Sequence, residues 1–176
     1  MARANNVDMG AFRKTQEGLK AGTAAARTMQ KVEGEWRLTG EGPQFRSVAP
    51  YPGGELVMET DMAKNMGGGG LMPGPMRFAF FGLAASYAGV FAQTASLLGI
   101  ELQRFTVTVE APMNTAKCYG VGDAPLVGDV RFTLSIKSNA PKEKLEEAQR
   151  LALERTPGVY ALRQPLKVTS AIQILA

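Results

Sequence analysis

The chain has 176 residues, 45% of them hydrophobic, and a formal net charge of +4. This length suffices for one full hydrophobic core or two small lobes, and the apolar content argues against a disordered chain. There is no histidine and one cysteine, Cys118. A Ser-His-Asp triad, a histidine-activated cysteine, a Cys/His zinc site and an intramolecular disulfide are therefore excluded. We expect neither a metal nor a cofactor.

The charge pattern and the N-terminal residues suggest where the protein works. Basic residues are interleaved with acidic ones along the chain rather than gathered in one block, so no nucleic-acid partner is expected. The first twenty residues, "MARANNVDMGAFRKTQEGLK", lack the apolar core of a secretory signal. We therefore expect a cytoplasmic protein.

The N-terminal part is predicted to be a helical extension. Residues 7–30 mix alanines with charged residues, and Met9, Phe12 and Leu19 give a thin apolar stripe. This pattern indicates a weak amphipathic helix that must dock on another surface to persist. We divide the chain into an extension, residues 1–30, and a main domain, residues 31–176.

Short strands and one long helix are predicted next. Residues 31–60 are short runs separated by Gly-Pro, Pro-Tyr-Pro and Gly-Gly, which is typical of a three-stranded antiparallel meander. The glycine-rich string "NMGGGGLMPGP" lacks the following Lys-Ser or Lys-Thr of a phosphate-binding loop, and we interpret it as a hinge or mobile loop. A helix is predicted from Pro75, as its first residue, to Leu98, with Gly99 stopping it.

The remaining elements complete an α+β pattern. "QRFTVTVEA" and "GDVRFTLSIKS" alternate apolar and polar residues, so each is predicted to be a strand with one covered face. "APKEKLEEAQRLALER" has the spacing of an amphipathic helix that ends at Pro157. The alternation in "PLKVTSAIQIL" predicts a closing strand. Segregated sheets and helices result, rather than regular β-α-β alternation.

The long uncharged helix allows two interpretations. Residues 78–100 could span a bilayer, but Ser86, Gln93 and Thr94 interrupt the stretch, and leucine and isoleucine are few. A helix covered on all sides within a soluble core is favoured, and no membrane partner is expected. The small residues Gly82 and Gly89 lie near one face, where a second element, which could belong to a partner chain, can approach closely.

Several strings together resemble the OsmC/Ohr family of osmotically inducible and organic hydroperoxide resistance proteins. They are "GGELVMETDMA", "GGGGLMPGPMRFAFFGLAASYAGVFAQTASLLGIEL", "VRFTLSIKSNAPKEKLEEAQRLALERTP" and the final "PLKV". The resemblance implies an OsmC-like α+β fold of antiparallel sheets, a buried central helix and a second amphipathic helix, in an intertwined homodimer. It also implies a peroxide-attacking cysteine in the central helix, a resolving cysteine later in the chain, and an arginine held by a glutamate.

The chain departs from that family pattern at each catalytic position. The resemblance places the attacking cysteine at Ser86, the resolving cysteine at Thr156 and the glutamate at Arg77, while Arg46 lies near the expected arginine. A serine hydroxyl is almost fully protonated at neutral pH and lacks the oxidation states of sulfur. The sequence therefore predicts that the peroxidase cycle is lost.

Three functions remain open. The first is a dimer that binds a small apolar ligand in a pocket lined by Met72, Phe78, Phe81, Ser86 and Tyr87; there the Ser86 hydroxyl either bonds a carbonyl one turn back or touches the ligand. The second is an organic hydroperoxide reductase that acts through Cys118, beside Lys117, with an external thiol. The third is a membrane-associated protein.

Overall fold

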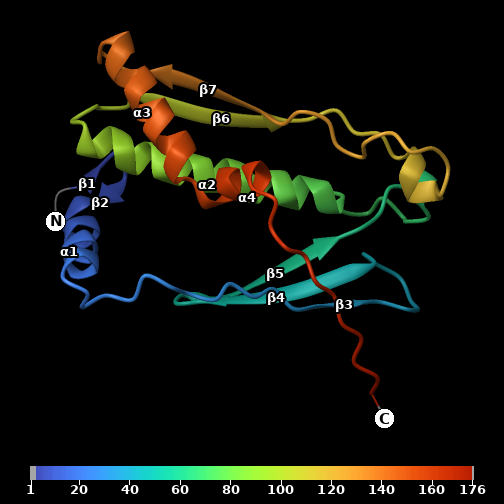
Figure 1. Ribbon diagram of the computed structural model, residues 1–176. Helices are drawn as coiled ribbons and strands as arrows, with labels where there is room; N and C mark the ends of the chain where they lie inside the picture. The colour runs from blue at the N-terminus through green and yellow to red at the C-terminus, as the bar shows by residue number, and fades with distance from the viewer. Residues whose placement is uncertain (1–2, 176) are drawn as a thin grey trace. The chain divides into compact units, whose positions relative to one another are not determined.

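The computed structural model describes residues 3–175, which form a mixed α+β fold (Figure 1). The chain divides into two compact units. The first unit holds Asp8–Gly82, and the second holds residues 3–7 and 83–175. The predicted α+β class is confirmed.

The first unit contains a helix and a three-stranded antiparallel sheet. Helix α1, Met9–Lys20, begins at Asp8, whose side chain accepts a hydrogen bond from the Ala11 N–H at 3.0 Å. The sheet has the order β3-β4-β5, with bounds Gly34–Trp36, Phe45–Tyr51 and Gly54–Thr60. The predicted meander is confirmed, whereas the predicted helix over residues 7–30 is too long.

The glycine-rich segment after β5 folds into tight turns, including the 3-10 helix η1, Lys64–Met66. Gly67 has φ of +81°, which favours glycine. A Cβ at Gly68 would lie 2.0 Å from the Met62 carbonyl oxygen. Glycine is therefore required here for backbone packing, and the interpretation of the string as a hinge or mobile loop did not include these turns.

Helix α2, Pro75–Leu97, has the predicted boundaries to within one residue. Pro75 is its first residue, as predicted. At its end Gly99 has φ of +68°, and the N–H groups of Gly99 and Ile100 donate to the carbonyls of Ser96 and Ala95 at 3.3 and 2.8 Å. These two bonds form a Schellman motif, because glycine tolerates the left-handed conformation.

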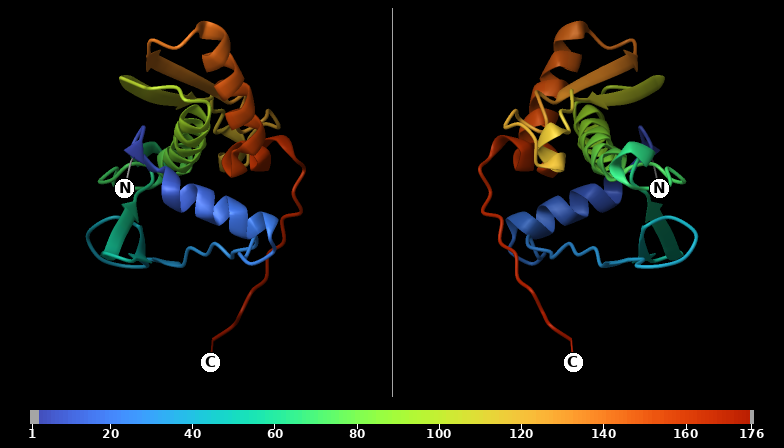
Figure 2. Two further views of the ribbon diagram at one scale, coloured as in Figure 1. Left: turned by 90° about the vertical axis from the view of Figure 1, so that its left-hand side faces the viewer. Right: turned by 90° about the vertical axis from the view of Figure 1, so that its right-hand side faces the viewer.

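The core of the second unit lies between α2, helix α3 (Lys142–Arg155) and the hairpin of β6 (Arg104–Glu110) and β7 (Arg131–Lys137). Figure 2 shows both helices on one side of this hairpin. Tyr87 meets Phe132 edge to face at a centroid distance of 5.2 Å, and Phe91 packs on Phe105 at 4.8 Å. The strict alternation of the two strands places their apolar side chains on this face, as the sequence predicts.

Helix α2 is less covered than the sequence indicates. Its buried residues are Tyr87, Phe91, Thr94 and Ala95, all in its C-terminal half. Among residues 3–175 it is the one helix long and apolar enough to cross a membrane, a test that core helices of water-soluble proteins also pass. The packing of these buried residues on α3 and the hairpin accounts for the apolar composition of the C-terminal half of α2 only, since Phe81 in the N-terminal half is 72% exposed.

An N-terminal hairpin was not predicted. Strands β1, Arg3–Ala4, and β2, Val7–Asp8, flank Asn5 and Asn6, which both have positive φ. The Asn5 amide donates to Ser96 Oγ at 3.0 Å and to the Ile100 carbonyl at 2.8 Å, and its oxygen accepts the Leu102 N–H at 2.9 Å. The hairpin therefore fixes the segment that follows α2.

The C-terminal segment differs most from the sequence prediction. A short helix, α4, Pro157–Arg163, follows α3, and residues 165–175 then have no regular structure. The predicted closing strand is wrong for the isolated chain. Val168, Ile172 and Ile174 are 90% exposed or more, and no strand among residues 3–175 pairs with this segment.

Candidate functional site

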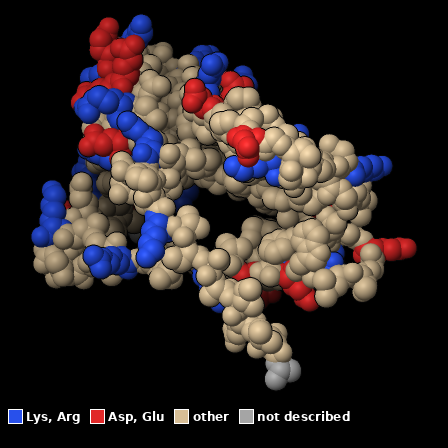
Figure 3. All heavy atoms as spheres, turned by 45° about the vertical axis from the view of Figure 1, so that its right-hand side comes forward, with Lys and Arg blue, Asp and Glu red and all other residues tan. Residues whose placement is uncertain are grey.

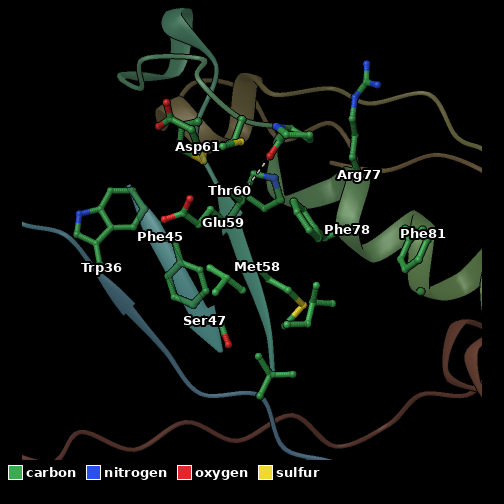
Figure 4. Close-up of a pocket in the computed structure, with 18 residues that line it drawn as sticks. Trp36, Phe45, Ser47, Met58, Glu59, Thr60, Asp61, Arg77, Phe78 and Phe81 are labelled. Atoms are coloured by element: carbon green, nitrogen blue, oxygen red, sulfur yellow. Dashed lines mark hydrogen bonds between the residues drawn. The ribbon is translucent and has the colours of Figure 1, made fainter. Parts of the chain in front are cut away.

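A cavity of about 1130 Å³ lies in the first unit, between the three-stranded sheet and the first two turns of α2. Its apolar lining includes Trp36, Phe45 and Met58 from the sheet and Phe78 and Phe81 from the helix, as Figure 4 shows. Aromatic and sulfur-containing side chains around such a volume are typical of a site for a small apolar molecule.

One wall of the cavity carries an ion-pair cluster. Glu59 stands directly opposite Arg46 in the β4–β5 pair. Its carboxylate accepts a hydrogen bond from the Arg37 guanidinium at 2.7 Å and lies 3.9 Å from Arg46 Nε. The negative charge of Glu59 is thus balanced by two cations.

Asp61 forms a second polar part of the lining, and it is 2% exposed. Its Oδ2 accepts the Leu71 N–H at 2.9 Å, which ties the glycine-rich turns to the end of β5. Its Oδ1 is buried and has no hydrogen-bond partner within residues 3–175. Asp61 therefore holds the loop in place and presents little charge to the solvent.

Arg77 lies at the open edge of the cavity, since it is exposed and also lines it. In Figure 4 its side chain extends away from Phe78 and Phe81. Within the described chain, no carboxylate lies within ion-pair distance of its guanidinium. The first turn of α2 contains no acidic residue either.

The two positions that the resemblance assigns to cysteines belong to the second unit. Thr156 is fully buried, and its hydroxyl donates to the Ala152 carbonyl at 2.6 Å. A Cβ at Gly158 would lie 3.6 Å from both Cβ and Oγ of Ser86. Ser86 thus packs beside the first turn of helix α4.

The Ser86 hydroxyl makes no hydrogen bond within residues 3–175, so the predicted bond to a carbonyl one turn back is not found. The same kind of bond forms further along α2, where Thr94 and Ser96 donate to Val90 and Ala92, each at 2.8 Å. Ser86 acts as a small packing residue in this structure.

Tyr87 lies in the core of the second unit and is fully buried. Burial raises the pKa of its phenol to about 12, and a polar contact with Gln149 opposes this shift. The neutral phenol is therefore strongly favoured at physiological pH.

Cys118 is exposed in the 3-10 helix η2, Ala116–Tyr119, within the long β6–β7 connection. It is a free thiol, and it belongs to the second unit. No group of three or more His, Cys, Asp or Glu residues in the described part of the chain is arranged to hold a metal ion.

The predicted pocket residues are divided between the two units. Met72, Phe78 and Phe81 line the cavity together with Arg77, whereas Ser86 and Tyr87 belong to the second unit. Trp36, Glu59 and Asp61, which also line the cavity, were not among the predicted residues. The Arg46–Glu59 pair had a usable signal, because the two residues stand six positions before and six positions after the Pro52-Gly53 turn.

These observations define an α+β protein with a long central helix and an apolar cavity. A sequence profile of the OsmC-like protein family matches residues 67–171, more than half of the chain. The chain therefore belongs to the OsmC-like protein family. Comparison with curated protein sequences finds no match.

Solved structures share this fold. An OsmC-like protein from Mycoplasma pneumoniae is 14% identical, with a TM-score of 0.57 over 78% of this chain and 89% of the other. An organic hydroperoxide resistance protein OsmC from Legionella pneumophila is 17% identical, with a TM-score of 0.51 over 78% and 92%. An OsmC-like protein of unknown function from Vibrio cholerae is 10% identical, with a TM-score of 0.53 over 77% and 95%.

Proposed function

We propose that this OsmC-family protein lacks the two-cysteine peroxidase cycle and works as a homodimer that binds a small apolar molecule. The observation that carries the proposal is the cavity of about 1130 Å³, which is lined mainly by aromatic and aliphatic side chains and contains no thiol. Burial of an apolar ligand there is favourable by about 25 cal/mol for each Å² removed from water.

The proposed loss of peroxidase chemistry follows from the number of cysteines in the chain. A resolving disulfide within one chain needs two thiols, and the chain has one cysteine. Ser86 and Thr156 stand at the positions that the resemblance assigns to cysteines, and a hydroxyl cannot be oxidised to a sulfenic acid. The OsmC-like fold would then bind a ligand without catalysing a redox reaction.

Tryptophan fluorescence tests the binding function directly. Trp36 is the only tryptophan of the chain and lines the cavity. Titration with a panel of alkyl and aromatic compounds should shift or quench its emission saturably, and the same ligands should raise the melting temperature.

Trp36→Phe is the control for this titration: it should remove the optical signal while the thermal shift remains. If no compound in a broad apolar panel changes either readout, the binding function is wrong.

The homodimer is supported by apolar surface that the isolated chain leaves uncovered. Phe81 on α2 is 72% exposed, and the C-terminal segment exposes alternate apolar residues. A second copy of the chain is the partner that the family resemblance implies, and it would cover such surfaces. Location in the cytoplasm and a role in the oxidative stress response are part of the same proposal.

A second candidate function is an organic hydroperoxide reductase with one cysteine. The exposure of Cys118 favours it, because a peroxide and an external thiol can both reach the sulfur. The thiolate would attack the peroxide oxygen, releasing the alcohol and leaving a sulfenic acid that external thiols reduce.

Peroxide consumption with a dithiol, compared between wild type and Cys118→Ser, separates the two functions. A rate that falls to background in the variant supports the reductase. No activity above buffer in the wild type excludes it.

A further inference from the structure

The cavity carries one positive charge that no carboxylate of the described chain balances. Glu59 is paired with Arg37 and lies near Arg46. Asp61 is buried and holds the Leu71 N–H. Arg77 is the remaining charged residue of the lining, and it is exposed with no ion-pair partner among residues 3–175.

The position of Arg77 fits the polar end of an amphipathic ligand. Phe78, one residue later on the same helix, faces the apolar lining, while the Arg77 side chain extends away from it at the open edge (Figure 4). Because Arg77 is exposed, its long side chain is free to turn toward the opening, where it would meet the polar end of a ligand whose apolar body lies against Phe78 and Met58. A guanidinium presents a planar fork of donors that matches a carboxylate.

We infer that the cavity selects an apolar molecule that ends in an anionic group, a carboxylate above all, and that Arg77 is the residue that determines this preference. The inference rests on the proposed binding function and adds the chemical class of the ligand. A carboxylate on the ligand would form an ion pair with the Arg77 guanidinium, whereas an ammonium group on the ligand would be repelled by the same positive charge.

Three probes with the same alkyl chain test this preference: decanoate, its neutral methyl ester and decylammonium, each below its micelle concentration. Trp36 emission and melting temperature report binding. The wild type should bind decanoate about five- to tenfold more tightly than the ester, as expected for a charge-assisted contact at a partly exposed site, and decylammonium most weakly. Added salt should reduce the decanoate preference.

Variants of Arg77 assign the preference to this residue. Arg77→Met should bring decanoate and the ester to within about twofold of each other, Arg77→Lys should keep part of the preference, and Arg77→Glu should favour decylammonium. Arg13→Met, which removes an exposed arginine of α1 outside the lining, should leave it unchanged. Far-ultraviolet circular dichroism confirms that each variant is folded.

The outcomes distinguish this inference from the function on which it rests. Equal binding of decanoate and the ester by the wild type, or a preference kept in Arg77→Met, overturns the inference and leaves the binding function standing. If none of the three probes binds, nor any compound of the broad panel, the binding function itself fails.

Discussion

At the scale of single residues, the hydroxyl of Ser86 stands at the position that the resemblance assigns to a cysteine. The hydroxyl has no hydrogen-bond partner in the described chain, and the side chain packs beside Gly158. Its size therefore matters more than its polarity. The same principle explains Gly68, where the nearby Met62 carbonyl leaves no room for a Cβ.

Tyr87 gives a prediction for stability against pH. Its pKa rises from 10.0 to about 12 on folding because of burial. The folded state binds the phenolic proton more tightly, so this contribution is complete below pH 10 and is lost as the pH rises toward 12. The free energy of unfolding of the wild type should therefore fall faster over this range than that of Tyr87→Phe.

Urea titrations at several alkaline pH values measure this difference in slope. Wild-type and Tyr87→Phe curves that run parallel from neutral pH to pH 12 would contradict the assignment.

At the scale of elements, the N-terminal hairpin stabilises the end of α2 through Asn5. Asn5→Gly keeps the positive φ and removes three hydrogen bonds to Ser96, Ile100 and Leu102. We expect the free energy of unfolding to fall by about 1–3 kcal/mol, because partly buried groups lose their partners. Asn6→Gly is the matched control, since it keeps the positive φ and removes only the exposed bond from Arg3.

Chemical denaturation compares these two variants. A loss for Asn6→Gly as large as that for Asn5→Gly would contradict the assignment of this stability to the Asn5 side chain.

An element could be predicted from the sequence where local residues determine it, and could not where contacts with distant residues determine it. Strands β6 and β7 and helix α3 carry their own periodicity, and Pro75 and Gly99 mark the ends of α2 through local backbone preferences. The N-terminal hairpin has only two residues in each strand, which is too short for a pattern. Its stability comes from Ser96 and Ile100, more than ninety residues away.

The residues of the candidate site also differ in whether local sequence could have predicted their positions. The Pro52-Gly53 turn could have predicted that Arg46 faces Glu59, because a two-residue turn fixes the register of the strands beside it. Burial of Asp61 under the glycine-rich turns could not be predicted, since it depends on the path of the loop.

At the scale of the whole molecule, residues 165–175 have the alternating sequence pattern of a strand but form no strand in the structure. Alternation determines which residues share a face, but a strand forms only beside another edge. In the described chain, residues 165–175 pair with none of the free edges of the sheets, and the proposed dimer would provide an edge on the second copy.

The tail therefore gives a test of the dimer. Replacing Val168 and Ile172 by aspartate should convert a dimer into a monomer, because both apolar side chains would be buried between copies. Aspartates at Thr169 and Gln173, on the opposite face of the same segment, should have little effect. Size-exclusion chromatography with light scattering measures the mass of each.

A monomeric wild type at micromolar concentration would contradict the dimer, as would equal dissociation by both pairs of substitutions.

The distribution of charge on the surface also indicates which other partners are favoured. On the face drawn in Figure 3, Lys and Arg side chains lie among Asp and Glu side chains, with large uncharged areas between them. Such a surface favours apolar contacts over recognition of a polyanion.

The turn at Asn5 and Asn6 also has a chemical consequence for purified protein during storage. Hydrolysis of the Asn5 amide would replace its nitrogen by a carboxylate oxygen, which would then face the Ile100 carbonyl oxygen as a second acceptor. The two oxygens would repel each other. Slow deamidation at this one position would therefore loosen the end of α2 in ageing samples.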